Sequence, residues 1–281
     1  MYKILKKEYL TQTVIRITVS APLAARRAEP GQFVILRVCD DGERIPLTIS
    51  DYDREKGTVS VIFSACGATT MKLAAKNEGD LISDFAGPLG KPTDTDGVKK
   101  VAVVAGGVGC AIAYPVAKKF KNLGCTVHTV IGFRTKDLVI LCDEFKGVSD
   151  VFKLMSDDGT AGERGFVTAA LENLILGGEK YDKIITIGPL PMMKFVCAIA
   201  QKYNIPSVAS MNPIMIDGTG MCGGCRLTVG GKMCFACVDG PEFDGSLIDF
   251  DEAIARLSIY KDFENKKREE TCNLLGGIKN G

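Results

Sequence analysis

Residues 217–237 read Asp217-Gly-Thr-Gly-Met-Cys222-Gly-Gly-Cys225-Arg-Leu-Thr-Val-Gly-Gly-Lys-Met-Cys234-Phe-Ala-Cys237, and they gather four of the 11 cysteines of the chain. A hydrophobic core does not require cysteines to gather in this way. Soft thiolates on a loop of small residues are suited to Zn²⁺ or to an iron–sulfur cluster. Their order matches the plant-type [2Fe–2S] pattern C-x4-C-x2-C…C, with an aspartate in the first position. The segment therefore predicts a metal centre whose ligands are Asp217, Cys222, Cys225 and Cys237.

Two alternatives concern the choice of ligands. The four cysteines alone fit a zinc knuckle, with the spacing Cys222-x2-Cys225-x8-Cys234-x2-Cys237. Gly230-Gly231 predicts a tight hairpin that returns Cys237 to the loop. Cys234 would then stand about 10 Å up the strand, and this favours the cluster without Cys234. Asp217 has a second interpretation, since an aspartate at this point can simply cap a turn.

The composition indicates a globular protein of two domains and a small appendage, because the chain has 281 residues of which 46% are hydrophobic. A net charge of +1 gives no reason to expect a nucleic-acid or membrane partner. The N-terminus lacks the apolar region of a signal peptide, and no apolar run approaches the ~20 residues of a membrane span. An odd number of cysteines argues against a disulfide framework. We therefore expect a cytoplasmic protein.

Residues 1–97 predict a small antiparallel β-barrel, because short β-branched segments alternate with turns. The expected strands are Lys3–Tyr9, Thr13–Ser20, Gln32–Val38, Ile45–Ser50 and Thr58–Ser64. The segment Arg44-Ile-Pro46-Leu47-Thr48-Ile-Ser50 puts a cation and hydroxyl groups on one strand, which suits the phosphates and ring edge of a flavin. Gly67-Ala-Thr69-Thr70 opens a short helix, where free N–H groups can receive a pyrophosphate. A barrel without a ligand is the alternative.

Residues 98–212 predict a doubly wound α/β domain, because strands and helices alternate there. Gly106-Gly107-Val108-Gly109 follows the expected strand Lys100–Ala105 and precedes an expected helix over 110–122. This segment is not the G-x-G-x-x-G fingerprint. A glycine-rich turn from a strand into a helix can still receive a pyrophosphate. The alternative is a tight turn that binds no ligand. Further strands are expected at Thr126–Ile131, Val151–Met155, Lys183–Ile187 and Ser207–Ser210, and helices at Lys136–Phe145, Phe166–Leu174 and Met192–Lys202.

Residues 213–281 predict the metal-binding hairpin followed by helical stretches. Val238–Asp244 is expected to be a turn-rich exit, and Asp249–Leu257 and Tyr260–Leu274 to be helices. Their apolar side fits either docking on this chain or contact with a partner. His128, the single histidine, is expected in the core. Cys110 opens a helix, where the helix N-terminus would lower the pKa of a thiol, although a structural role is favoured. No catalytic residue is predicted.

Taken together, these motifs resemble the ferredoxin–NADP reductase-like family. Pro30-Gly31-Gln32-Phe33-Val34 and Gly87-Pro88-Leu89-Gly90 complete the set in family order, and the chain departs from the family strand motif by placing Leu47 between Pro46 and Thr48. The resemblance implies FAD, NAD(H) and a [2Fe–2S] cluster as cofactors, with NADP(H) as the alternative nucleotide. The implied FAD contacts are Arg44, Pro46, Leu47, Thr48, Ser50, Val61, Gly67, Thr69 and Thr70. The implied NAD contacts are Gly106, Gly107, Val108, Gly109, Arg134, Lys136, Asp157, Gly159, Gly188 and Pro189.

Two branches of this family are similar to the chain: the electron-transfer subunits of dihydroorotate dehydrogenase, and the small subunits of NADH-dependent reduced ferredoxin:NADP oxidoreductases, or sulfide dehydrogenases. Asp217 favours the second branch, where aspartate stands at this position. That resemblance implies an NAD-facing arm of an electron-bifurcating complex. It implies as partner a larger flavoprotein subunit that resembles the small subunit of glutamate synthase, with ferredoxin reached through that partner. A zinc-stabilised flavin-binding regulatory protein is the alternative from another class.

Overall fold

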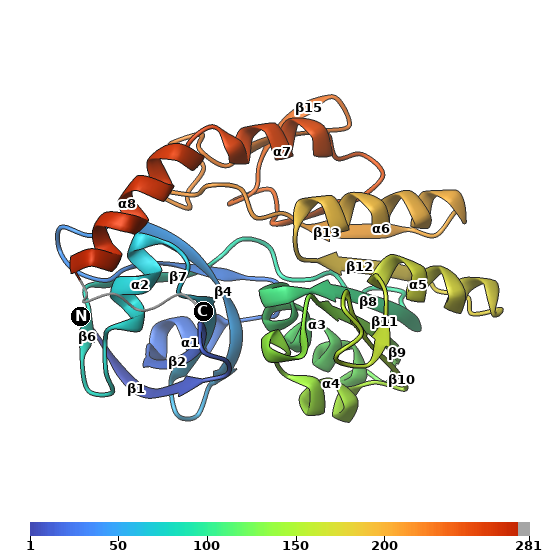
Figure 1. Cartoon of the computed structure of the whole chain (residues 1–281), viewed down its shortest axis with the longest axis horizontal. Coiled ribbons are helices and arrows are strands. Elements are labelled where there is room, and N and C mark those ends of the chain that lie inside the picture. The colour runs from blue at the N-terminus through green and yellow to red at the C-terminus, as the bar shows by residue number, and fades with distance from the viewer. Residues whose placement is uncertain (275–281) are drawn as a thin grey trace.

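The computed structural model describes residues 1–274 of the chain. A curled antiparallel sheet, an α/β layer and a C-terminal segment lie side by side, and the C-terminal segment runs back along both of the others (Figure 1). Within residues 1–274, no helix combines the length and the apolar character that crossing a bilayer requires. The last seven positions of the predicted C-terminal region, 275–281, lie outside the described residues.

The N-terminal sheet has seven antiparallel strands in the order β6-β1-β2-β5-β4-β3-β7. These segments form strands with one buried face because apolar and polar residues alternate along them. In β2, Ile15, Ile17 and Val19 are buried, whereas the residues between them face outward. Two short helices, α1 and α2, accompany the sheet. The bounds are β1 Tyr2–Tyr9, β2 Val14–Ser20, α1 Pro22–Arg27, β3 Phe33–Arg37, β4 Arg44–Asp53, β5 Thr58–Ser64, α2 Ala68–Ala74, β6 Leu81–Ile82 and β7 Asp84–Leu89.

The second sheet has six parallel strands, β11-β10-β9-β8-β12-β13, and one short antiparallel strand, β16, at its edge beside β13. Strand β8 lies between β9 and β12, so the chain crosses over at β8 and leaves a switch point at the carboxyl ends of β8 and β12. The strands are β8 Lys100–Gly106, β9 Thr126–Phe133, β10 Val151–Ser156, β11 Glu163–Arg164, β12 Lys183–Ile187 and β13 Ser207–Ser210. The helices are α3 Cys110–Asn122, α4 Cys142–Val148, α5 Val167–Leu176 and α6 Leu190–Lys202.

One predicted helix of this domain is wrong in extent. The segment expected as one helix over Lys136–Phe145 begins as a 3-10 turn, η2 Lys136–Leu138, and α4 starts only at Cys142. Leu141 separates the two because its φ of 57° is left-handed and cannot continue a right-handed helix. The predicted bounds of α3, β12 and β13 agree with the structure to within a residue.

The C-terminal segment begins with the predicted hairpin, β14 Arg226–Val229 and β15 Lys232–Phe235. Gly230 and Gly231 have φ values of 57° and 72°, as a two-residue turn of this hand requires. The expected turn-rich exit is partly wrong, because β16 Glu242–Asp244 pairs antiparallel with β13 and extends the second sheet. Helices α7 Phe250–Ser258 and α8 Lys261–Leu274 follow, and α8 lies along α2 of the first domain (Figure 1).

A shared hydrophobic core joins the three parts. It contains Phe33 and Ile35 from β3, Met193 from α6, and Leu227 from the hairpin. Burying these side chains against one another stabilises the molecule by roughly 1.5–3 kcal/mol for each large residue. The C-terminal segment is therefore held against both domains.

Candidate functional site

The two predicted flavin motifs lie beside each other. Arg44 begins β4, and Thr69 lies in the first turn of α2. The Thr69 hydroxyl donates a hydrogen bond of 2.9 Å to the Glu43 carboxylate, one residue before Arg44. Arg44 is exposed and forms no ion pair with any residue in the described part of the chain. An unpaired guanidinium beside the opening of a helix can hold phosphate oxygens.

The opening turn of α2 is fixed by its own residues. The Gly67 N–H donates to the Thr70 hydroxyl at 3.0 Å, and that hydroxyl donates to the Gly67 carbonyl at 3.0 Å. This closes the start of the helix next to β4. Glu43 is not among the predicted residues, although its position next to Arg44 places it at the same end of β4.

Two residues of the predicted flavin set are engaged within the barrel itself. Val61 is 0% exposed, so it belongs to the barrel core. A flavin contact at Val61 stays a prediction. The buried Ser50 hydroxyl donates to the Ser60 carbonyl at 3.0 Å. Pro46, Leu47 and Thr48 are half-buried on the same strand and keep accessible surface.

The glycine-rich loops of the second domain meet at the switch point between β8 and β12. A Cβ atom on Gly109 would lie 2.6 Å from the Ile187 carbonyl oxygen and 2.8 Å from the Gly188 Cα. A Cβ on Gly188 would lie 3.1 Å from the backbone of Gly106. Only glycines allow these two backbones to approach so closely, and a backbone without side chains at this switch point is what a pyrophosphate requires.

The polar loops after β9 and β10 also meet. The Lys136 N–H donates to the Thr160 hydroxyl at 2.9 Å, and the Asp157 N–H donates to the Phe133 carbonyl at 3.1 Å. Arg134 and Lys136 are exposed, and neither forms an ion pair within residues 1–274. The structure thus brings Arg134, Lys136, Asp157 and Gly159 to the same edge of the sheet as the glycine loops.

Two other side chains of this domain are structural. The expected lowering of the Cys110 pKa is wrong, because complete burial raises the pKa of this thiol and outweighs the hydrogen bonds at the start of the helix. The favoured structural role of Cys110 agrees with this burial. His128 lies in the core as expected, with its Nδ1 atom 3.0 Å from the Tyr181 hydroxyl. Burial lowers the pKa of His128.

The cysteine segment forms a loop that leads into the β14–β15 hairpin. The sulfur atoms of Cys225 and Cys237 lie 3.2 Å apart, and both residues are buried. Burial raises the pKa of Cys237 to about 12 when no metal is bound. Asp217 accepts hydrogen bonds from the N–H groups of Thr219 at 2.8 Å and Cys222 at 2.9 Å, which lower its pKa. These two bonds from backbone N–H groups are those of a turn cap, the second interpretation of Asp217, and its role as a metal ligand stays a prediction.

The loop offers three thiols and one carboxylate, which are donors that a [2Fe–2S] cluster can take. Within residues 1–274, no three histidine, cysteine or acidic residues surround one position that could hold a metal ion. A [2Fe–2S] cluster spreads its four protein ligands over two irons, and this loop offers two pairs. Cys234 packs against the shared core instead of joining either pair.

The loop rests on the strand that neighbours the flavin motif. A Cβ on Gly218 would lie 2.7 Å from Leu89 and 2.9 Å from Ile35, so the loop backbone lies directly on the barrel. Ile35 is the register partner of Pro46 across β3 and β4. The cysteine loop and the predicted flavin strand are thus separated by one strand.

Comparisons with known proteins agree with this arrangement. A family model for the iron-sulfur cluster binding domain of dihydroorotate dehydrogenase B matches residues 212–249. A Thermotoga maritima protein named as a homolog of the electron transfer subunit of dihydroorotate dehydrogenase B (NAD(+)) is 44% identical over 98% of this chain and 96% of its own. The electron transfer subunit of that enzyme from Clostridium acetobutylicum is 34% identical over 77% of this chain and 85% of its own.

One solved structure shares the whole architecture, and another shares the larger part of it. In a study of flavin-based electron bifurcation, the structure of an NADH-dependent reduced ferredoxin-NADP oxidoreductase contains a chain that is 44% identical to this one. It superposes with a TM-score of 0.91 over 96% of this chain and 97% of that chain. The cytochrome b5 reductase domain of Ulva prolifera nitrate reductase shares the fold of the first two domains, with a TM-score of 0.61 at 17% identity.

Proposed function

Because the chain belongs to the family of the dihydroorotate dehydrogenase B electron-transfer subunits and their homologues, we propose that it moves electrons between NAD(H), FAD and a [2Fe–2S] cluster. Its role is that of the NAD-facing arm of an electron-bifurcating ferredoxin:NADP transhydrogenase. The observation that carries this choice is the likeness to the NADH-dependent reduced ferredoxin-NADP oxidoreductase over almost the full length of both chains. Asp217 in the first ligand position supports the same choice.

The three cofactors divide the chemistry. A flavin takes two electrons from a nicotinamide and releases them singly to a one-electron centre, which is why FAD belongs between NAD(H) and the cluster. The task of the protein is to position and shield these groups. In our proposal Arg44, Thr69 and Thr70 bind the flavin phosphates, and Pro46, Leu47 and Thr48 line its ring.

The nucleotide lies across the carboxyl ends of the parallel strands. Gly106, Gly107, Val108 and Gly109 approach the pyrophosphate with their backbone, and Gly188 and Pro189 flank the nicotinamide. Arg134 and Lys136 face the adenosine end, and Asp157 and Gly159 complete the crevice. We propose NAD(H) as the working nucleotide. The unpaired Arg134 and Lys136 would also accept a 2′-phosphate, so NADP(H) is the alternative.

For the cluster we propose that Cys225 and Cys237 hold one iron, and that Asp217 and Cys222 hold the other. The 3.2 Å between the sulfur atoms of Cys225 and Cys237 supports the first pair, and the order of the residues in the plant-type pattern supports the second. A carboxylate oxygen is a harder ligand than a thiolate and should alter the reduction potential of the centre. Glycine N–H groups around the loop, such as that of Gly224 at 3.5 Å from the Cys222 sulfur, adjust it further.

The face around the cluster loop is suited to a partner subunit. Ile216, directly before Asp217, is 52% exposed, and Met221, directly before Cys222, is 88% exposed. Exposed apolar side chains beside a redox loop favour docking of another protein. We propose a larger glutamate-synthase-like flavoprotein as that partner, with ferredoxin reached through it. The cysteines outside the cluster loop, from Cys39 to Cys197, form no disulfide, which supports a reducing, cytoplasmic location.

The test is anaerobic analysis of iron and acid-labile sulfide, followed by electron paramagnetic resonance of the dithionite-reduced protein. We expect about two irons and two sulfides per chain. Asp217→Ala should alter or abolish the signal, and Asp217→Cys should retain a cluster with a shifted potential. Cys234→Ala is the matched control and should leave the signal unchanged. Zinc without sulfide would contradict the proposed electron transfer through a cluster. An unchanged resonance signal in Asp217→Ala would contradict Asp217 as a ligand.

A second candidate is the electron-transfer subunit of an NAD-dependent dihydroorotate dehydrogenase, which the names of the relatives favour. Co-purification from the native organism distinguishes the two. A partner that oxidises dihydroorotate would favour this second candidate. A larger flavoprotein that couples NADPH to ferredoxin and NAD⁺ would favour the first.

A further inference from the structure

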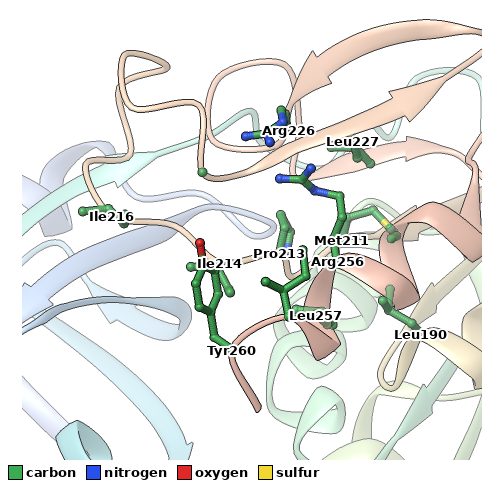
Figure 2. Close-up of a pocket in the computed structure, with 13 residues that line it drawn as sticks. Leu190, Met211, Pro213, Ile214, Ile216, Arg226, Leu227, Arg256, Leu257 and Tyr260 are labelled. Carbon is green, nitrogen blue, oxygen red and sulfur yellow. The ribbon is translucent and has the colours of Figure 1, made fainter. Parts of the chain in front are cut away.

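A pocket of about 160 Å³ lies between helix α7, strand β14 and the segment that precedes the cluster loop. Its walls are largely apolar and include Pro213 and Ile214 from the preceding segment, Leu227 from β14 and Leu257 from α7 (Figure 2). Gly224, which lies between two predicted cluster ligands, forms part of the wall. The nucleotide and flavin motifs contribute none of these residues.

Two arginines contribute the only charges in the lining of this pocket. Arg226 and Arg256 come from β14 and α7, and Figure 2 shows their guanidinium groups on one side of the pocket, with the Tyr260 hydroxyl projecting toward that side. Arg226 donates to the Gly223 carbonyl at 3.1 Å. Arg256 is half-buried, and neither arginine has a carboxylate partner within residues 1–274. Two cations that face one space without an acidic residue are complementary to an anion.

The size of the pocket limits the ligand. An apolar cavity of about 150 Å³ is large enough for benzene, so this one admits a body of roughly six to eight heavy atoms. Drug-sized ligands need about 300 Å³ or more. The apolar wall suits a ring or a branched alkyl group, and the arginines suit one carboxylate at its end.

We propose that this pocket is a binding site for a small amphipathic monocarboxylate, with an aromatic or branched aliphatic body. The body lies against Leu227, Leu257 and Ile214. The carboxylate accepts hydrogen bonds from the guanidinium groups of Arg226 and Arg256, and the Tyr260 hydroxyl is available as a third donor. The site goes beyond the proposed electron transfer and does not depend on it for binding.

Bound ligand would act on the cluster loop through charge. A carboxylate between Arg226 and Arg256 neutralises positive charge next to Gly224 and Cys225, which makes addition of an electron to the neighbouring centre less favourable. We therefore expect a more negative cluster potential when the site is filled. This consequence rests on the proposed function, whereas binding itself does not.

The experiment is calorimetric titration of the cofactor-loaded, full-length chain with benzoate, with benzamide as the neutral probe of the same shape. We expect one saturable site for benzoate and at least tenfold weaker binding of benzamide. Arg256→Gln and Arg226→Gln should each weaken benzoate about tenfold. Arg268→Gln, on the exposed surface of α8, is the matched control and should bind as the wild type does.

Three outcomes would overturn the proposal. They are absence of saturable benzoate binding at millimolar concentration, equal affinity for benzamide, or unchanged binding in both pocket variants. If benzoate fails to bind while Arg226→Gln and Arg256→Gln weaken association with the partner subunit, the pocket belongs to a protein contact instead. Calorimetry requires no redox activity, so a negative titration is distinguishable from a missing cluster. Arg226→Gln keeps the test valid if Arg256→Gln does not fold, because Arg226 is exposed.

Discussion

Substitution of Gly109 by alanine tests the close approach at the switch point. The φ of Gly109 is −57°, which alanine adopts without strain, so only the added Cβ matters. That atom would lie 2.6 Å from the Ile187 carbonyl oxygen, whereas ordinary contact begins at 3.4 Å. The ends of β8 and β12 must therefore separate by roughly 0.8 Å, since both neighbouring groups are backbone.

The cost follows from overpacking. Forcing a methyl group into a packed contact costs about 1–3 kcal/mol, and the loss of glycine freedom in the unfolded chain offsets about 0.4–1 kcal/mol of it. We expect a net loss of about 1–2 kcal/mol and a fall in Tm of roughly 2–8 °C. Because the same loops form the proposed nucleotide crevice, the Kd for NAD⁺ should rise about tenfold or more.

Thermal unfolding and titration with NAD⁺ measure both effects. Gly147→Ala is the control, since it lies in α4 with no heavy atom within 4 Å of the added Cβ and should leave stability unchanged or raise it by about 0.5–1 kcal/mol. A Gly109→Ala protein that melts and binds NAD⁺ as the wild type does would refute the close approach and its role in the site.

Three further substitutions address charge. Arg134→Ala should change the KM for NADH less than twofold but raise that for NADPH about tenfold or more; equal losses in steady-state kinetics with both donors would contradict NAD(H) as the working nucleotide. Burial lowers the pKa of His128 in the folded protein. As the pH drops below about 6.5, the imidazole is therefore protonated in the unfolded chain before it is protonated in the folded chain, and the folded protein loses stability. His128→Asn, which removes the single histidine, should flatten the plot of Tm against pH between 5 and 7, and an unchanged slope would contradict this origin. Burial raises the pKa of the Glu242 carboxyl group, which accepts a 2.6 Å hydrogen bond from Thr93. Above about pH 4.5 the carboxyl group loses its proton in the unfolded chain before it does so in the folded chain, so the stability of the folded protein decreases as the pH rises. In urea unfolding, Glu242→Gln should accordingly have a higher free energy of unfolding than the wild type at pH 7 but not at pH 4. A lower free energy of unfolding at pH 7 would show that the carboxylate itself stabilises the fold.

The sequence predicts most of the fold because the decisive signals are local. Alternation fixes the barrel strands, and Gly230-Gly231 fixes the hairpin that brings Cys237 back to Cys225. The pairing of β16 with the second sheet is different. Its three residues carry no pattern of their own, and they form a strand only because β13 offers an open edge.

The site is less predictable wherever burial decides the chemistry. Sequence position suggests a reactive Cys110 at a helix start, but complete burial raises its pKa, and burial is a property of the packed molecule. Val61 fits a family pattern yet faces the barrel core. The pocket with Arg226 and Arg256 has no signal in the sequence, because α7 reaches β14 only through tertiary packing.

The arrangement of the three parts explains why one short strand, β3, matters to the proposed relay. It pairs with β4, which carries the flavin motif, and its Ile35 side chain supports the cluster loop at Gly218. A shift of β3 would therefore change the distance between the proposed flavin site and the proposed cluster. A shift of the nucleotide loops would leave that distance unchanged. Electron transfer from flavin to cluster thus depends on the packing of the barrel, and delivery from NAD(H) depends on the switch point, so core variants in the two domains should impair different half-reactions.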